Sequence, residues 1–185
     1  TFAKDRFVEI EIILDDDLGL KIPNSAIVEK EFYLIPKQYL TRGGNGAQEG
    51  FMIETYDDSK SLIATGSGFC AYNENWIITN FHVIEGARHI SVITDDGQTL
   101  DALAVTLFNK KEDLAILEIN GELTPLTLGD GTKLRVKDKV TAIGSPMGER
   151  NTVSEGIISN ADSNREIRIS APISHGSSGG VLLDK

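Results

Sequence analysis

Residues 175–183 read His-Gly-Ser-Ser-Gly-Gly-Val-Leu-Leu, so a pair of serines lies in a glycine-rich turn directly before an apolar run. Glycine adopts positive φ angles without a steric penalty, so such a turn can bring its serines close to another chain. A short apolar run bounded by glycines is typical of a β-strand. The stretch therefore predicts a serine displayed at the entry to a strand.

Two segments earlier in the chain carry side chains that complement a serine. Residues 79–84 (TNFHVI) place His82 just after an apolar strand predicted at 76–79, and residues 112–117 (EDLAIL) place Asp113 directly before another strand. A serine hydroxyl is a weak nucleophile that needs an imidazole to accept its proton. A carboxylate on the other ring nitrogen holds the imidazole in the right tautomer and stabilises its charged form. The three segments together indicate nucleophilic acyl transfer.

Neighbouring residues leave the assignment open at this point. Ser177 lies beside Ser178, Glu112 lies beside Asp113, and His175 is a second histidine near the serines. The third histidine, His89, begins an alternating strand with no catalytic residue type beside it, and we expect it to be structural.

The composition of the 185 residues excludes several classes of protein. There are 28 acidic and 18 basic residues, a net charge of −10, and this acidic balance argues against nucleic acid or an anionic membrane as the main partner. No run approaches the roughly 18 consecutive apolar residues of a membrane-spanning helix. The single cysteine, Cys70, excludes an internal disulfide and a metal site built on several thiolates. We expect it to be a buried thiol.

Short runs of alternating apolar residues predict a mainly β protein, either a barrel or a sandwich. The predicted strands are residues 6–14, 31–35, 51–56, 66–72, 76–79, 89–94, 100–108, 114–119, 139–143, 152–159, 166–170 and 180–183. The one helical signal, a single turn, lies within residues 81–87 after Asn80. The glycine-rich residues 41–50 and the polar residues 57–60 are the best linker candidates, so we place a domain boundary near Asp58.

Five motifs in order make residues 66–185 resemble the trypsin-like serine proteases, most closely the HtrA/Deg-type branch. They are residues 79–84, 112–117, 142–148 (AIGSPMG), 152–159 (TVSEGIIS) and 175–180. The resemblance implies a trypsin-like double β-barrel. It also implies that His82 is the general base, that Asp113 orients it and that Ser178 is the nucleophile.

The same resemblance favours Ser178 over Ser177, because the family's Gly-x-Ser-Gly-Gly turn then places Gly176 correctly. It implies an oxyanion hole made by the amides of Gly176 and Ser178. Pro172 aligns with the base of the family's specificity pocket, which implies a preference for small or aliphatic side chains, and His175 is expected at the pocket mouth. The sequence departs from the family pattern at Ser177, where asparagine is usual, and at His175, where proline is frequent.

The chain begins at Thr1 and stops at Lys185, shortly after the serine turn, where the family continues with two further strands. An unclosed barrel leaves a bare strand edge and an unsealed core. The resemblance therefore predicts an incomplete second barrel and weak or absent turnover by this chain on its own.

The first 57 residues carry no grouping of catalytic residue types. Residues 21–28 (KIPNSAIV), with 32–39 continuing the likeness, resemble the β-domain of HlyD-type efflux adaptor proteins, a resemblance that covers about residues 1–45. The alternative is an N-terminal β extension that packs on the protease domain. We therefore divide the chain into an N-terminal β segment, residues 1–57, and a protease domain, residues 58–185.

The sequence as a whole predicts a serine endopeptidase that acts on polypeptides and needs no metal or cofactor. The alternative is a non-catalytic binding module, or an efflux-adaptor-associated fragment that carries an inactive, truncated protease domain. We expect an extracytoplasmic location, in the cell envelope or secreted. A membrane-associated context through residues 1–57 and assembly into a homo-oligomer both stay open.

Overall fold

A computed structural model describes residues 34–36, 40–42, 49–161 and 166–184, which all belong to one compact unit spanning Leu34–Lys185. The strand predicted at residues 6–14 and the adaptor-like residues 21–28 lie outside the described residues.

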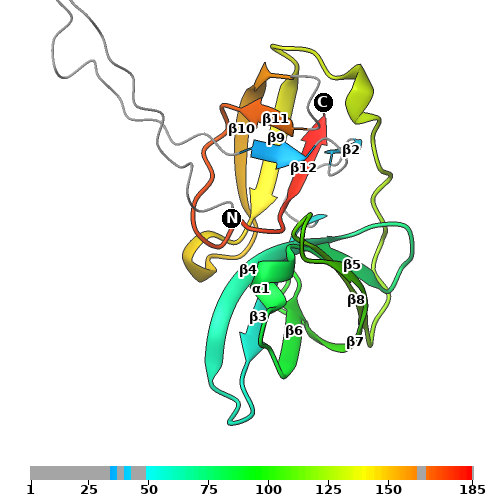
Figure 1. Ribbon diagram of the computed structural model, residues 1–185, viewed down its shortest axis with the longest axis vertical. Coiled ribbons are helices and arrows are strands. Elements are labelled where there is room, and N and C mark those ends of the chain that lie inside the picture. Colours follow the sequence, from blue (N-terminus) through cyan, green and yellow to red (C-terminus); the bar gives the residue numbers. More distant parts are fainter. Residues whose placement is uncertain (1–33, 37–39, 43–48, 162–165, 185) are drawn as a thin grey trace, which may run out of the picture. The chain divides into compact units, whose positions relative to one another are not determined.

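Six antiparallel strands form a closed barrel in the order β3-β4-β5-β8-β7-β6 (Figure 1). They are β3 (Phe51–Tyr56), β4 (Leu62–Cys70), β5 (Trp76–Thr79), β6 (His89–Ile93), β7 (Thr99–Asn109) and β8 (Leu114–Ile119). Strand β8 shows why these residues form a barrel wall, since Ala115, Leu117 and Ile119 are buried while the residues between them are partly exposed. Successive side chains of a strand point to opposite faces, so this alternation turns one apolar face toward the core.

The single helical turn expected within residues 81–87 is α1 (Phe81–Ile84), which directly follows β5. It ends early because Glu85 is extended and Gly86 has φ +81°. Its residues Val83 and Ile84 are buried in the barrel core. In the described part of the chain, no helix has the length and apolar character required to cross a membrane.

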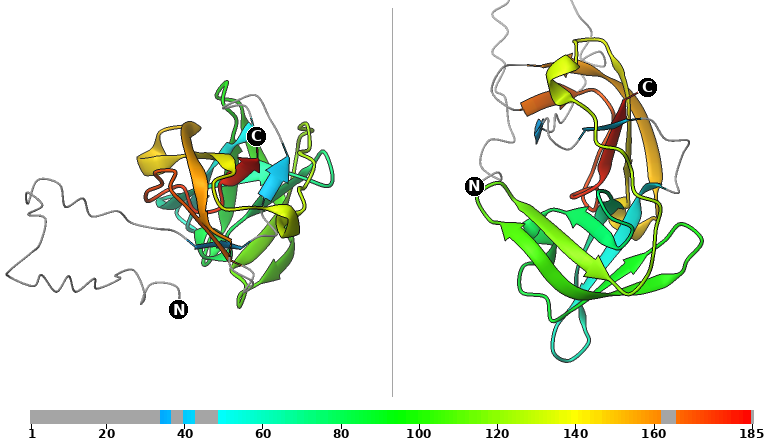
Figure 2. Two further views of the ribbon diagram at one scale, coloured as in Figure 1. Left: turned by 90° about the horizontal axis from the view of Figure 1, so that it is seen from above. Right: turned by 90° about the vertical axis from the view of Figure 1, so that its right-hand side faces the viewer.

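A second sheet of six strands has the order β1-β11-β10-β9-β12-β2 and curls without closing (Figure 2). Its strands are β1 (Leu34–Pro36), β2 (Leu40–Arg42), β9 (Lys139–Gly144), β10 (Thr152–Asn160), β11 (Glu166–Ile169) and β12 (Val181–Asp184). All pairs are antiparallel except β12 with β2. The closed barrel and this half-barrel confirm the predicted double β-barrel fold with an incomplete second barrel.

The residues near the predicted domain boundary belong with the barrels. Asp58 lies in the turn between β3 and β4, and β3 pairs with both β4 and β6. Strand β3 is therefore a barrel strand, although it precedes the predicted boundary. Strand β2 begins at Leu40 and enters the predicted linker, while residues 43–48 of that linker lie outside the described residues. A separate N-terminal segment thus stays a prediction only for residues before Leu34.

An apolar cluster joins the barrel to the half-barrel. It combines Phe69 and Ile78 of the barrel with Ile143, Val181 and Leu183 of the half-barrel. Burial of apolar surface is favourable and non-directional. This cluster therefore holds the two sheets together without determining their exact relative position.

Cys70, at the end of β4, is 1% exposed, which confirms the expected buried thiol. Burial raises the pKa of the thiol to about 11. The sulfur is therefore protonated at neutral pH, and it packs as a small apolar group.

Two leucines of the barrel allow a matched test of this core. Leu117→Ala removes a side chain that is fully buried, whereas Leu103→Ala removes one that is 66% exposed on the neighbouring strand β7. We expect Leu117→Ala to lower the free energy of unfolding by about 2–5 kcal/mol. We expect Leu103→Ala to change it by no more than about 0.5 kcal/mol. Urea denaturation followed by circular dichroism measures both, and equal losses would contradict the assigned core.

Candidate active site

His82 follows strand β5, Asp113 precedes the neighbouring strand β8, and two hydrogen bonds join these residues. The Asp113 Oδ2 atom lies 2.6 Å from His82 Nδ1, and Asp113 Oδ1 accepts from the His82 backbone N–H over 2.8 Å. The carboxylate thus fixes both the ring and the backbone of the histidine. The His82 side chain is 54% exposed and that of Asp113 is 22% exposed, so the imidazole remains accessible.

The backbone of Asp113 adopts φ +52°, in the left-handed region. Aspartate tolerates this region better than most residues. The side-chain amide of Asn80 donates to the Asp113 carbonyl over 2.8 Å and supports this conformation. Asn80 therefore does not cap α1 with its side chain, as its position before the helix suggested. The Asp113 carboxylate instead accepts a backbone N–H of the first turn of α1.

Ser178 lies in the turn before β12, in a segment that hydrogen bonds tie to the barrel. Its carbonyl accepts from the Ser67 backbone N–H over 2.8 Å. The next residue, Gly179, has φ +84°, and a Cβ there would overlap Ser67 O and Thr79 Oγ1 and lie 2.9 Å from Asn80 N. The serine turn therefore lies against the chain segment that leads into α1 and His82.

The amides of this turn differ in their hydrogen bonding. Ser177 N donates to Ser174 O over 3.0 Å, and Gly180 N donates to Ser177 O over 2.9 Å. The amides of Gly176 and Ser178 have no hydrogen-bond acceptor among the described residues. Two N–H groups of one turn are therefore available to a bound group.

The Ser178 hydroxyl and the His82 imidazole are not hydrogen-bonded to one another in the part of the chain that the structure describes. Catalytic hydrogen bonds are often long without substrate and tighten when it binds. The structure thus joins two of the three predicted catalytic side chains directly and brings the third close through its backbone.

The predicted pocket residues Pro172 and His175 are both exposed. Pro172 lies in the segment between β11 and the serine turn, and the His175 carbonyl accepts from Met147 N over 2.9 Å. His89 begins β6 and pairs with Tyr56 of β3.

Two residues of the site were missed by reasoning from sequence. Ser67 in β4 donates its hydroxyl proton to Gly176 O over 2.6 Å, and Asn80 supports Asp113. A serine between Gly66 and Gly68 was the available signal for the first.

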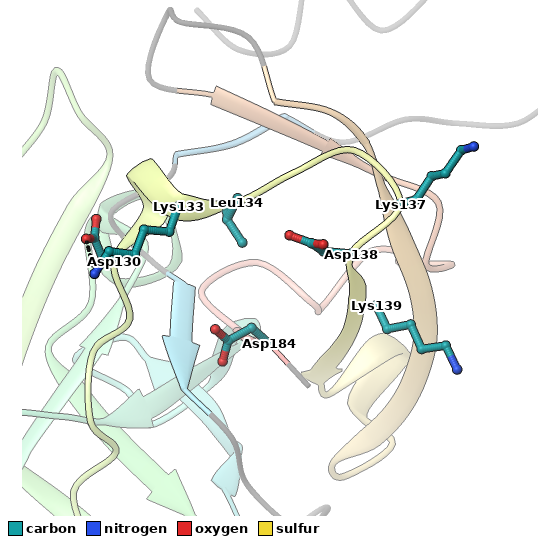
Figure 3. A pocket seen from close by; sticks show the side chains of 7 residues that line it. All are labelled: Asp130, Lys133, Leu134, Lys137, Asp138, Lys139 and Asp184. Carbon is teal, nitrogen blue, oxygen red and sulfur yellow. Dashed lines mark ion pairs between the residues drawn. The ribbon is translucent and has the colours of Figure 1, made fainter.

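A hollow elsewhere in the half-barrel contains none of these residues (Figure 3). Asp130 and Lys133 at its rim form an ion pair over 3.2 Å, and the side chains of Lys137 and Lys139 are directed away from it. Across the described ranges, no group of three or more His, Cys, Asp or Glu residues is placed to hold a metal ion.

The family model of the trypsin-like peptidase domain matches residues 66–185. The chain belongs to this family. The match begins in β4 and includes His82, Asp113 and Ser178, and with it the resemblance drawn from the five motifs is confirmed.

Curated relatives narrow the family to its HtrA/Deg-type branch. A probable periplasmic serine endoprotease DegP-like from Halomonas elongata is 40% identical over 134 residues, 68% of this chain and 28% of the relative. The protein of the same name from Chlamydia trachomatis is 38% identical over 128 residues, 64% of this chain and 26% of the relative. Serine protease HTRA1 from Xenopus laevis is 36% identical over 149 residues, 74% of this chain and 32% of the relative. The chain thus spans about a quarter to a third of the length of these relatives.

Two glycines with similar backbone angles test how tightly the serine turn is packed. Gly179 and Gly148 have φ +84° and +79°, but a Cβ on Gly148 meets no atom within 4 Å. Gly148→Ala should therefore lower the free energy of unfolding only by the cost of a left-handed backbone, about 1–2 kcal/mol. Gly179→Ala adds an overlap with the Ser67 carbonyl, which should cost about 1–3 kcal/mol more. The difference between their free energies of unfolding in urea measures the overlap, and a value near zero would show that the turn is loosely packed.

Proposed function

We propose that this chain is a serine endopeptidase that cleaves peptide bonds through an acyl-enzyme, with Ser178 as nucleophile, His82 as general base and Asp113 as the orienting carboxylate. The observation that carries the proposal is the double hydrogen bond of the Asp113 carboxylate to His82 Nδ1 and His82 N. In a Ser-His-Asp triad, a carboxylate bound in this way orients the histidine that accepts the serine proton.

The Asp113 carboxylate determines the tautomer of His82. An ionised carboxylate only accepts hydrogen bonds, so the imidazole proton lies on Nδ1 and Nε2 carries the free lone pair. That lone pair is the acceptor for the proton of Ser178. When Nε2 becomes protonated, the nearby carboxylate stabilises the imidazolium.

The amides of Gly176 and Ser178 supply the oxyanion hole in this proposal. Neither amide has an acceptor among the described residues, and both belong to the turn that displays the nucleophile. Donors aimed at the oxygen on which charge develops stabilise the tetrahedral intermediate.

The reaction follows from these three parts. The Ser178 oxygen bonds to the carbonyl carbon while its proton moves to His82 Nε2, and the carbonyl π electrons move to the oxygen. The oxyanion then re-forms its double bond, the C–N bond breaks, and His82 gives its proton to the leaving amine. Water repeats the sequence on the ester and releases Ser178.

A non-catalytic binding module is the second candidate, and the missing hydrogen bond between Ser178 and His82 is the observation that favours it. Such a protein would retain the fold and the His82–Asp113 pair but would not activate its serine. Because a catalytic hydrogen bond can also stay long until substrate binds, the reactivity of Ser178 separates the two candidates.

The names of two relatives support a proposal for the substrate and the location. Both are named periplasmic serine endoproteases, so we propose an extracytoplasmic location and a polypeptide substrate. Pro172 and His175 are exposed near the serine turn in sequence, and we propose them as pocket residues, with a preference for small or aliphatic side chains.

A fluorophosphonate probe tests the nucleophile directly. The Ser178 oxygen displaces fluoride from phosphorus, its proton passes to His82, and the protein becomes covalently labelled. We expect one label per chain, lost in Ser178→Ala and retained in the matched control Ser177→Ala. Mass spectrometry of the labelled peptide gives the site. Absence of labelling in a protein that circular dichroism shows to be folded would favour the binding module.

A further inference from the structure

Ser67 is fully buried in β4, and each of its polar atoms bonds a segment of the proposed site. Its hydroxyl donates to Gly176 O over 2.6 Å and accepts from Ser145 N over 2.8 Å. Its amide donates to Ser178 O over 2.8 Å, and its carbonyl accepts from Thr79 Oγ1 over 2.7 Å. One barrel residue thus contacts the serine turn at two carbonyls.

The direction of the hydroxyl proton is determined by its neighbours. A serine hydroxyl has one proton to donate and two lone pairs. Because the Ser145 amide can only donate, Ser67 Oγ accepts from it and must give its own proton to Gly176 O. The three groups form a chain of hydrogen bonds in buried surroundings, where each bond polarises the next.

Gly176 lies between two peptide groups whose carbonyls each accept one hydrogen bond. The His175 carbonyl before it accepts from Met147 N over 2.9 Å, and the Gly176 carbonyl itself accepts from Ser67. A trans peptide points its N–H opposite to its C=O, so the Met147 bond sets the direction of the Gly176 N–H. The Ser67 bond to Gly176 O, together with the bond from Ser177 N to Ser174 O over 3.0 Å, sets the orientation of the next peptide group.

Glycine lacks the side chain that would restrict such a segment. Gly176 has φ +95°, a conformation that only glycine adopts readily, and without external bonds its flanking peptides can rotate. The orientation of the turn therefore depends on the groups that hold its carbonyls.

We propose that Ser67 is a positioning residue whose hydroxyl holds the Gly176–Ser177 peptide so that the amides of Gly176 and Ser178 face the reacting oxygen. The inference rests on the proposed function, since it concerns the oxyanion donors of that site. Ser67 acts through the turn and touches no substrate. Among the described residues it forms no hydrogen bond with His82 or Asp113.

This division of roles gives a distinctive signature. Loss of the Ser67 hydroxyl should slow attack by Ser178, because the developing oxyanion loses aligned donors. It should leave the His82–Asp113 hydrogen bond intact, and with it the downfield proton NMR signal of His82 Nδ1–H. A general collapse of the site would remove both.

The test compares the rate of fluorophosphonate labelling at Ser178 in three variants of the full chain. We expect Ser67→Ala to slow labelling by about 10²–10³-fold with an unchanged His82 Nδ1 proton signal. Ser67→Cys keeps a donor at this position, although sulfur is larger than oxygen and donates weakly, so its labelling rate should fall between those of Ser67→Ala and the wild type. The control Thr55→Val removes another fully buried hydroxyl of the barrel, bonded to Ala64 O over 3.2 Å, and should label at the wild-type rate.

The outcomes separate this inference from the function on which it rests. If wild-type protein is not labelled at Ser178, the proposed function fails and the role of Ser67 fails with it. If the wild type is labelled and Ser67→Ala reacts as fast as Thr55→Val, only the role of Ser67 is overturned. Ser67→Cys decides in the same way if Ser67→Ala does not fold. If Ser67→Ala loses the His82 Nδ1 proton signal as well as the fast labelling of Ser178, the role of Ser67 is also overturned, because the effect would then be a structural change of the whole site.

Discussion

The hydrogen bond from Ser67 N to Ser178 O joins the closed barrel to the serine turn over 2.8 Å, and the proposed site depends on it. His82 and Asp113 belong to the barrel, whereas Ser178 belongs to the half-barrel. The proposed chemistry therefore requires the two sheets to be held in a fixed relative position. A hydrogen bond weakens steeply when its angle or length changes. This bond and that of the Ser67 hydroxyl to Gly176 O therefore fix the serine turn against the barrel.

Small residues make this close approach possible. A Cβ on Gly144 would lie 3.0 Å from the Cα of Ser177, and Gly179 fits against Ser67 and Thr79 with no room for a side chain. The apolar cluster around Phe69 and Ile143 supplies adhesion between the sheets without direction. The glycines and the hydrogen bonds then determine the relative position of the two sheets, which apolar packing alone does not determine.

Local sequence patterns predicted most of the strands and some of the residues proposed for the site. Alternation within short runs predicted the barrel strands. His82 and Asp113 were predicted because a serine turn, a histidine and a carboxylate occur together in the chain, and the family resemblance favoured Asp113 over Glu112. The roles of Ser67 and Asn80 could not be predicted in this way, since they bond residues 109 and 33 positions away. The boundary near Asp58 came from a polar turn that resembles a linker in composition but connects two paired strands.

A crystal structure of the protein after reaction with a fluorophosphonate tests the central claim most directly, because it shows nucleophile and oxyanion hole at once. We expect phosphorus bonded to Ser178 Oγ. Its oxygen should lie about 2.7–3.1 Å from the amides of both Gly176 and Ser178. The Ser67 hydroxyl should still bond Gly176 O. Phosphorus on another residue, or a phosphoryl oxygen turned to solvent with the Gly176 amide facing away, would contradict it.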